Sequence, residues 1–240
     1  EVGASADTVV VVVLNAPQTE SVLVGEDGVV KSMKAGASVI SCATVPPEFA
    51  KDMEARCAEV GVHYLDAPIS GGSVKAANGQ LSVMASGTPE AFASARPALD
   101  AMAEKVFELG DAAGAGSAMK AVNQLLAGVH IATMAEALTF GMTQGVEPEK
   151  FVEVISQCAG TSWMLENRAP HVVAGDYTPY SSLERVIEEN KDLYYLKLRE
   201  AQTENPDSNT GLVGWTTFFL ECLVKQKQSL KIKVERENIL

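Results

Sequence analysis

The sequence has few cysteines, few cations and no long apolar run. Its four cysteines, Cys42, Cys57, Cys158 and Cys222, are widely spaced and form no C-x-x-C pair. This spacing argues against a disulfide or zinc framework and indicates reduced thiols. The three histidines are also far apart, with no carboxylate or cysteine at ligand spacing, so we expect no metal site.

The charge balance is acidic, with 31 Asp and Glu against 19 Lys and Arg and a net charge of −12. A nucleic-acid partner needs a basic surface, so the charge argues against this class of partner. The β-branched run at residues 9–14 is far too short to span a bilayer. No basic region precedes an apolar core at the start of the chain. We therefore expect no membrane partner and a cytoplasmic protein.

What is present is an alternation of short apolar runs and helical stretches in the first half of the chain. Buried strands are expected at residues 9–14, 37–42, 62–65, 81–85 and 105–109, and helices at 47–60 and 89–102. Strands and helices that alternate at this spacing predict an α/β fold with a doubly wound parallel sheet.

The pattern changes after residue 116. Residues 117–144 carry apolar side chains at helical spacing and predict one long helix, and residues 148–158 predict another. We divide the chain into an α/β domain at 1–113, a helical domain at 114–202 that begins with the long helix, and a divergent tail at 203–240. The tail opens with the polar, turn-rich TENPDSNTG.

The first candidate for chemistry is the segment DAPISGGSVKAANGQLSVMASG at residues 66–87, which holds a small-residue loop of Ser70, Gly71 and Gly72. Glycines after a strand let backbone N–H groups approach a carboxylate closely. The plainer alternative is an ordinary strand-to-loop turn.

The second candidate is the segment GAGSAMKAVNQLLAG at residues 114–128. It places Lys120 near the start of the predicted long helix, with Asn123 and Gln124 a turn further on. A lysine that is desolvated in a cleft has a lowered pKa and exchanges a proton near neutral pH. The alternative is a solvated helix lysine. A glycine loop, a buried amine and an amide together suit a pocket for a hydroxy acid.

With VVVLNAPQTESVLVG, SCATVPP and TSWMLENRAPHVVAGDYTPYS, these segments resemble the β-hydroxyacid dehydrogenase family of 3-hydroxyisobutyrate dehydrogenase, over residues 7–181. The resemblance implies oxidation of a short hydroxy sugar acid, such as L-threonate, with Lys120 as general acid/base. It also implies that the Ser70–Gly72 loop holds the acid group and that Asn123 and Gln124 hydrogen-bond the substrate. Many relatives have two asparagines there, so Gln124 is a departure.

The same resemblance implies a nicotinamide cofactor, NAD or NADP. Its expected contacts are Leu14 and Asn15 after the first strand, Thr44 in CATVPP, and Lys191 in a Lys-Asp-Leu. Leu14, Asn15 and Thr44 have an alternative interpretation as strand-end turn residues. Lys191 comes a few residues later than the family pattern, and its alternative is a surface helix lysine.

No G-x-G-x-x-G dinucleotide fingerprint follows the first strand. We therefore expect a partial Rossmann-type domain, without its first βαβ unit and most of the NAD site. One alternative function is a dehydrogenase or reductase of another small hydroxyacid, such as 3-hydroxyisobutyrate. The other is a non-catalytic remnant that serves as an interaction or dimerisation module. We also expect a homo-oligomer formed through the helical domain, with a larger fusion protein as a further option.

Overall fold

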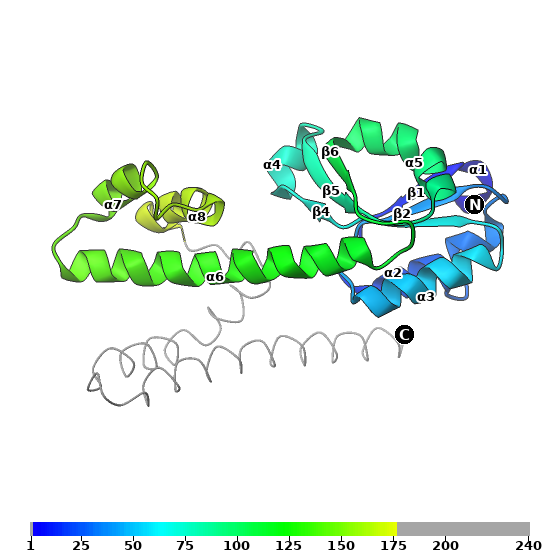
Figure 1. The fold of residues 1–240 in the computed structure, drawn as a ribbon, viewed down its shortest axis with the longest axis horizontal. Coiled ribbons are helices and arrows are strands. Elements are labelled where there is room, and N and C mark those ends of the chain that lie inside the picture. Colours follow the sequence, from blue (N-terminus) through cyan, green and yellow to red (C-terminus); the bar gives the residue numbers. More distant parts are fainter. Residues whose placement is uncertain (1, 177–240) are drawn as a thin grey trace, which may run out of the picture. The chain divides into compact units, whose positions relative to one another are not determined.

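The computed structural model describes residues 2–176, and they fall into two compact units that divide between Gln144 and Gly145 (Figure 1). The first unit contains the elements α1 Val2–Ser5, β1 Thr8–Val11, α2 Ala16–Val24, the 3₁₀ turn η1 Val29–Ser32, β2 Ser38–Ser41, α3 Pro47–Ala58, β3 His63–Asp66, β4 Ile69–Ser70, α4 Gly72–Ala77, β5 Leu81–Ala85, α5 Pro89–Met102, β6 Ala103–Glu108 and α6 Ala115–Thr143. The second contains α7 Pro148–Ile155 and α8 Trp163–Val173.

The strands form two three-stranded sheets that join at their edges. β1, β2 and β3 are parallel and adjacent in that order, which confirms the predicted α/β fold with a parallel sheet. In the second sheet β5 pairs with β6 in parallel and with β4 antiparallel. Asp66, at the end of β3, exchanges two backbone hydrogen bonds with Ser86, of 3.0 and 2.8 Å. Residues 66–70 therefore continue β3 and pair along β5.

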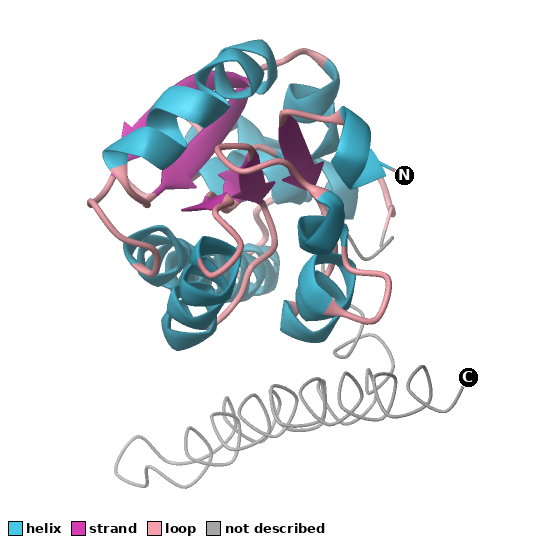
Figure 2. Cartoon of the chain, turned by 90° about the vertical axis from the view of Figure 1, so that its right-hand side faces the viewer, coloured by secondary structure: helices cyan, strands magenta, loops and turns pink. Residues whose placement is uncertain are grey.

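The buried strands supply apolar side chains to both faces of the first sheet, because successive residues of a strand point to opposite sides. Val39 and Tyr64 join the core with α2 and α3, while Ile40 and Leu65 join the core with α5. Figures 1 and 2 show the helices on both sides of the strands. Each fully buried side chain of this kind stabilises the fold by about 1.5–3 kcal/mol.

The long helix α6 confirms the helix predicted at residues 117–144. By length and apolar composition alone, this helix could cross a membrane, but a single helix of this kind is weak evidence for a membrane span. Its first turn is hydrogen-bonded to the sheet instead, through Asp66 and Ser86. Further along, α6 exposes a series of large apolar side chains: Met119, Val122, Leu125, Leu126 and Val129.

The second unit is described as far as Asp176. Ser162 caps α8 by accepting a hydrogen bond from the backbone N–H of Leu165 at 3.1 Å. Phe151 of α7 and Leu165 of α8 are buried. The expected tail at residues 203–240 and the candidate Lys191 lie outside the described residues.

Candidate active site

Lys120 is a buried cation on α6. Its side chain is 7% exposed, and within residues 2–176 it has neither a hydrogen bond nor an ion pair. Burial lowers the pKa of this lysine because it penalises the ammonium form. A charged group that is buried without a partner is expensive, and such groups cluster at functional sites. The solvated-helix alternative does not describe this residue.

The small-residue loop has a backbone conformation that favours glycine. Gly71 has a φ of 136° and Gly72 a φ of 70°, both in the region that L side chains rarely adopt. A Cβ at Gly71 would also come within 2.9 Å of the Lys75 Cβ and 3.0 Å of its Cδ. The stem of Lys75 therefore lies across the loop, and Lys75 has no ion pair among the described residues.

Strand β5 carries both motifs. Ser70 of the loop lies opposite Ser82, at one end of β5. Toward the other end, the carbonyl oxygen of Met84 packs directly against Gly116 in the first turn of α6. Lys120 follows Gly116 by about one helical turn. The loop and the lysine thus flank the same strand, while the direction of the amine toward the loop stays a prediction.

The amide pair lies on the same side of α6 as Lys120, because residues three and four apart share a helix face. Asn123 is half-buried and Gln124 is exposed. The Asn123 side chain donates a hydrogen bond to the Gln124 carbonyl oxygen at 3.1 Å. Their expected contact with substrate stays a prediction.

Asp66 is the site residue that the sequence analysis missed. It is fully buried, and its carboxylate accepts four hydrogen bonds, all from groups at the start of α6 or at the end of β5. The only signal in the sequence is an acidic residue at the end of a buried strand. Its partner Ser117 lies 51 residues away, so only the folded chain reveals the contact.

Three of the expected cofactor contacts lie at one edge of the first sheet. Leu14 and Asn15 follow β1, Thr44 follows β2, and the two strands are parallel neighbours. Leu14 and Thr44 are exposed. The Asn15 side chain caps α2 by accepting a hydrogen bond from the backbone N–H of Gln18 at 3.0 Å. Asn15 therefore has a structural role at the turn between β1 and α2. The cofactor contacts of all three residues stay predictions.

The described residues could bind only part of a dinucleotide cofactor. The ends of β1 and β2 leave backbone and the Thr44 hydroxyl available at the sheet edge. The segment between β1 and α2, residues 12–15, contains no glycine, and Asn15 occupies the first turn of α2 with its own side chain. A pyrophosphate needs free N–H groups at such a helix start. The start of α2 therefore does not provide these free N–H groups.

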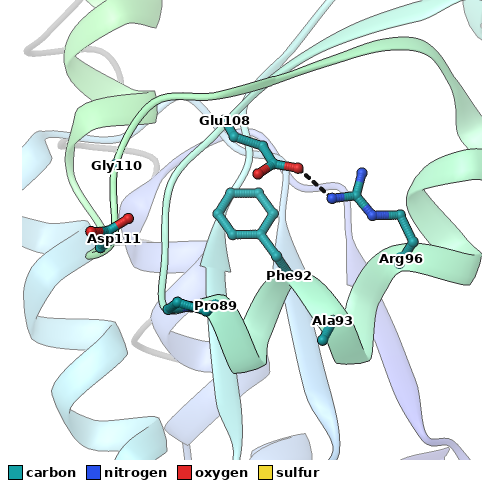
Figure 3. Close-up of a pocket in the computed structure, with 7 residues that line it drawn as sticks. All are labelled: Pro89, Phe92, Ala93, Arg96, Glu108, Gly110 and Asp111. Atoms are coloured by element: carbon teal, nitrogen blue, oxygen red, sulfur yellow. Dashed lines mark hydrogen bonds and ion pairs between the residues drawn. The ribbon is translucent and has the colours of Figure 1, made fainter.

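A separate open cavity of about 490 Å³ lies between α5 and the end of β6 (Figure 3). Arg96 and Glu108 form an ion pair along its wall, and the Phe92 ring lies beside them. None of the expected site residues lines it; the lining residues are Pro89, Phe92, Ala93, Arg96, Glu108, Gly110 and Asp111.

Two family profiles match the chain in succession. Residues 1–110 match the NAD binding domain of 6-phosphogluconate dehydrogenase. Residues 114–204 match a profile described as NAD-binding of NADP-dependent 3-hydroxyisobutyrate dehydrogenase.

Individual relatives agree with these profiles. The L-threonate dehydrogenase of Cupriavidus necator is 49% identical over 189 residues, which cover 79% of this chain and 64% of the relative. That of Haemophilus influenzae is 44% identical over 183 residues, or 76% of this chain and 61% of the relative. A crystal structure of 3-hydroxyisobutyrate dehydrogenase from Salmonella typhimurium is 40% identical with a TM-score of 0.73, covering 90% of this chain and 74% of that one. The chain thus spans a little over three fifths of the length of these curated relatives.

Proposed function

Because the chain belongs to the β-hydroxyacid dehydrogenase family of 3-hydroxyisobutyrate dehydrogenase, we propose that it forms the proton-transferring and substrate-binding part of a dehydrogenase for a short sugar acid. The resemblance expected from the sequence is confirmed, including that to L-threonate dehydrogenases. The expected nicotinamide cofactor agrees with both family profiles. L-Threonate is the proposed substrate because it is named for these relatives.

The observation that carries this proposal is that Lys120 is buried and has no ion pair or hydrogen bond within residues 2–176. Oxidation of a hydroxyl group to a carbonyl releases a proton and a hydride. NAD or NADP, when bound, accepts the hydride. The proton needs a base beside the hydroxyl, and an amine whose pKa is lowered by burial is more often neutral at working pH. Lys120 then holds that proton on Nζ and releases it to solvent when product leaves.

The acid group of the substrate is assigned to the loop of Ser70, Gly71 and Gly72. Gly72 leaves the backbone open to close approach, since no atom lies within 4 Å of the place where its Cβ would be. Lys75, whose stem lies across Gly71, adds a cation without an ion pair in the described residues. Local cations of this kind let a chain with a net charge of −12 attract an anion.

Two other functions have less support. A dehydrogenase of another small hydroxyacid, such as 3-hydroxyisobutyrate, fits the Salmonella typhimurium structure but has no better support than L-threonate. A non-catalytic interaction module has no need of a buried lysine that lacks a partner among the described residues, so Lys120 argues against it.

The decisive test is oxidation of L-threonate with NAD by the chain, completed with the remaining length of the Cupriavidus necator relative, and by its Lys120→Ala variant. General acid–base groups contribute about a hundred- to ten-thousand-fold, so kcat should fall by that factor. Lys105→Ala, which removes an exposed lysine of β6, is the matched control and should keep full activity. Equal turnover of wild type and Lys120→Ala would overturn the assigned role. Faster turnover of 3-hydroxyisobutyrate than of L-threonate would change the assigned substrate but not the assigned role of Lys120.

We also propose a cytoplasmic homo-oligomer that buries part of α6. The exposed fractions of Leu125, Leu126 and Val129 are 68%, 52% and 51%. Large apolar side chains that lie this close together on one helix are seldom so exposed. Light scattering should give a mass above that of one chain, and Leu125→Lys should lower it.

A further inference from the structure

Asp66 holds the first turn of α6 with both carboxylate oxygens. Oδ2 accepts hydrogen bonds from the backbone N–H groups of Gly114 at 3.0 Å and Ser117 at 2.8 Å, and from the Ser86 hydroxyl at 3.3 Å. Oδ1 accepts the Ser117 hydroxyl at 2.6 Å. The Ser86 hydroxyl oxygen in turn accepts the N–H of Gly116 at 2.9 Å. All of these groups lie inside the fold.

This arrangement differs from the side-chain capping of α2, α5 and α8. Asn15, Thr88 and Ser162 each cap their own helix with their own side chain. The N-cap residue of α6 is Gly114, which has no side chain to offer. The N–H groups that a helix start leaves unpaired are therefore satisfied by a carboxylate from a distant strand, which also complements the positive end of the helix dipole.

Lys120 lies one turn beyond this anchor, three residues after Ser117 and on the same helix face. We propose that Asp66 is the positioning residue of Lys120: by fixing the first turn of α6 on strands β3 and β5, it sets where the lysine amine stands relative to the loop that pairs with β5. This inference rests on the proposed function of Lys120.

Asp66 acts through position and not through its charge on Lys120. Both carboxylate oxygens already accept hydrogen bonds from α6 or from Ser86. Burial is the cause of the lowered pKa of Lys120, and no charge from Asp66 is among its causes. An asparagine at position 66 can keep the geometry, since its carbonyl oxygen accepts from Gly114 and Ser117 while its NH₂ donates to the Ser117 hydroxyl oxygen.

The experiment compares Asp66→Ala and Asp66→Asn in the completed chain with L-threonate and NAD. A displacement of about 1 Å at a catalytic group lowers the rate by up to about a hundredfold, so Asp66→Ala should lower kcat about ten- to a hundredfold with KM within about twofold. Asp66→Asn should stay within about threefold of wild type. Thr88→Ala is the matched control, because it removes the N-cap of α5, a helix without Lys120, and should leave kcat unchanged.

A second readout follows the Lys120 amine directly, by NMR titration of the ¹³C-dimethylated lysine. Asp66→Ala should move its pKa back toward the ordinary value as the turn loosens and water enters, while Asp66→Asn should keep it lowered. If Asp66→Ala fails to fold, Ser117→Ala, which keeps the backbone bond to Oδ2, replaces it and should show the same shift to a smaller extent.

Two results would overturn the inference: a Lys120 titration and kcat in Asp66→Ala that match Thr88→Ala, or a folded Asp66→Asn variant as impaired as Asp66→Ala. Full activity of the Lys120→Ala variant would instead contradict the proposed catalytic role of Lys120. The titration alone would then decide whether Asp66 positions the lysine.

Discussion

Lys120 is a buried lysine with no carboxylate partner among residues 2–176. Such a group weakens the folded state, because burial removes the water that stabilises the ammonium ion. The ordinary structural solution would be an apolar side chain or an acidic partner. Neither is found at this position among the described residues. Destabilising burial of this kind is typical of a functional group whose pKa must be lowered.

Replacement of Lys120 by methionine should therefore stabilise the protein by about 0.5–2 kcal/mol at neutral pH. The pKa of Lys120 lies below its usual 10.5 in the folded state, so between the two values the unfolded chain binds more protons. The unfolding free energy of the wild type then rises with pH across that window. The gap between Lys120→Met and wild type should be largest below the lowered pKa and close toward pH 10.5.

Urea unfolding at a series of pH values measures this gap. Lys105→Met, at an exposed position, is the control and should show no such pH dependence. A less stable Lys120→Met variant, or a gap that does not change with pH, would mean that the buried ammonium carries no penalty.

At the scale of elements, the contact between α6 and the sheet organises the site. Gly116 is the closest point of this contact, because a Cβ there would collide with the carbonyl oxygen of Met84 and come within 2.7 Å of that of Asp66. Both obstacles are backbone atoms and cannot rotate away. The glycine is therefore required by packing, although its φ is not in the left-handed region.

Gly116→Ala should destabilise the protein by about 1–3 kcal/mol, the usual effect of overpacking. Gly128→Ala is a matched control in the same helix, with no atom within 4 Å of the added Cβ. It should stabilise by up to about 1 kcal/mol, because alanine favours a helix over glycine. Thermal unfolding of both variants measures the difference. Equal effects at the two positions would show that α6 does not press on β5 as described.

At the scale of the whole chain, the elements with a sustained pattern were predictable. The short apolar runs at residues 9–14, 37–42 and 62–65 became β1, β2 and β3, and the long apolar periodicity became α6. β4 was not predicted, because two residues carry no pattern and its antiparallel pairing depends on the bend after Asp66. The cap at Asn15 was readable in principle, since Asn directly before a helix start is a standard signal.

The part of the candidate site that lies within one segment could be proposed from the sequence, with the family resemblance. Lys120 and the glycine loop belong to this class, and their roles stay predictions. The Asp66 network does not, because it joins residues 20 to 51 positions apart through a junction of two sheets. Hydrogen bonds of that range depend on the tertiary fold and leave no local trace in the sequence.

Cofactor binding depends on the molecule as a whole. The sequence has no G-x-G-x-x-G segment, and the first turn of α2 is already capped by Asn15. Free N–H groups at a helix start are what hold a pyrophosphate. The 240-residue chain should therefore bind NAD with a Kd no tighter than about 1 mM, which corresponds to only about −4 kcal/mol. The chain completed with the remaining length of the Cupriavidus necator relative should bind NAD in the micromolar range. Isothermal titration calorimetry of both proteins measures the difference. Micromolar binding by the chain alone would show that the strand ends at Leu14, Asn15 and Thr44 suffice, and that no pyrophosphate loop is needed.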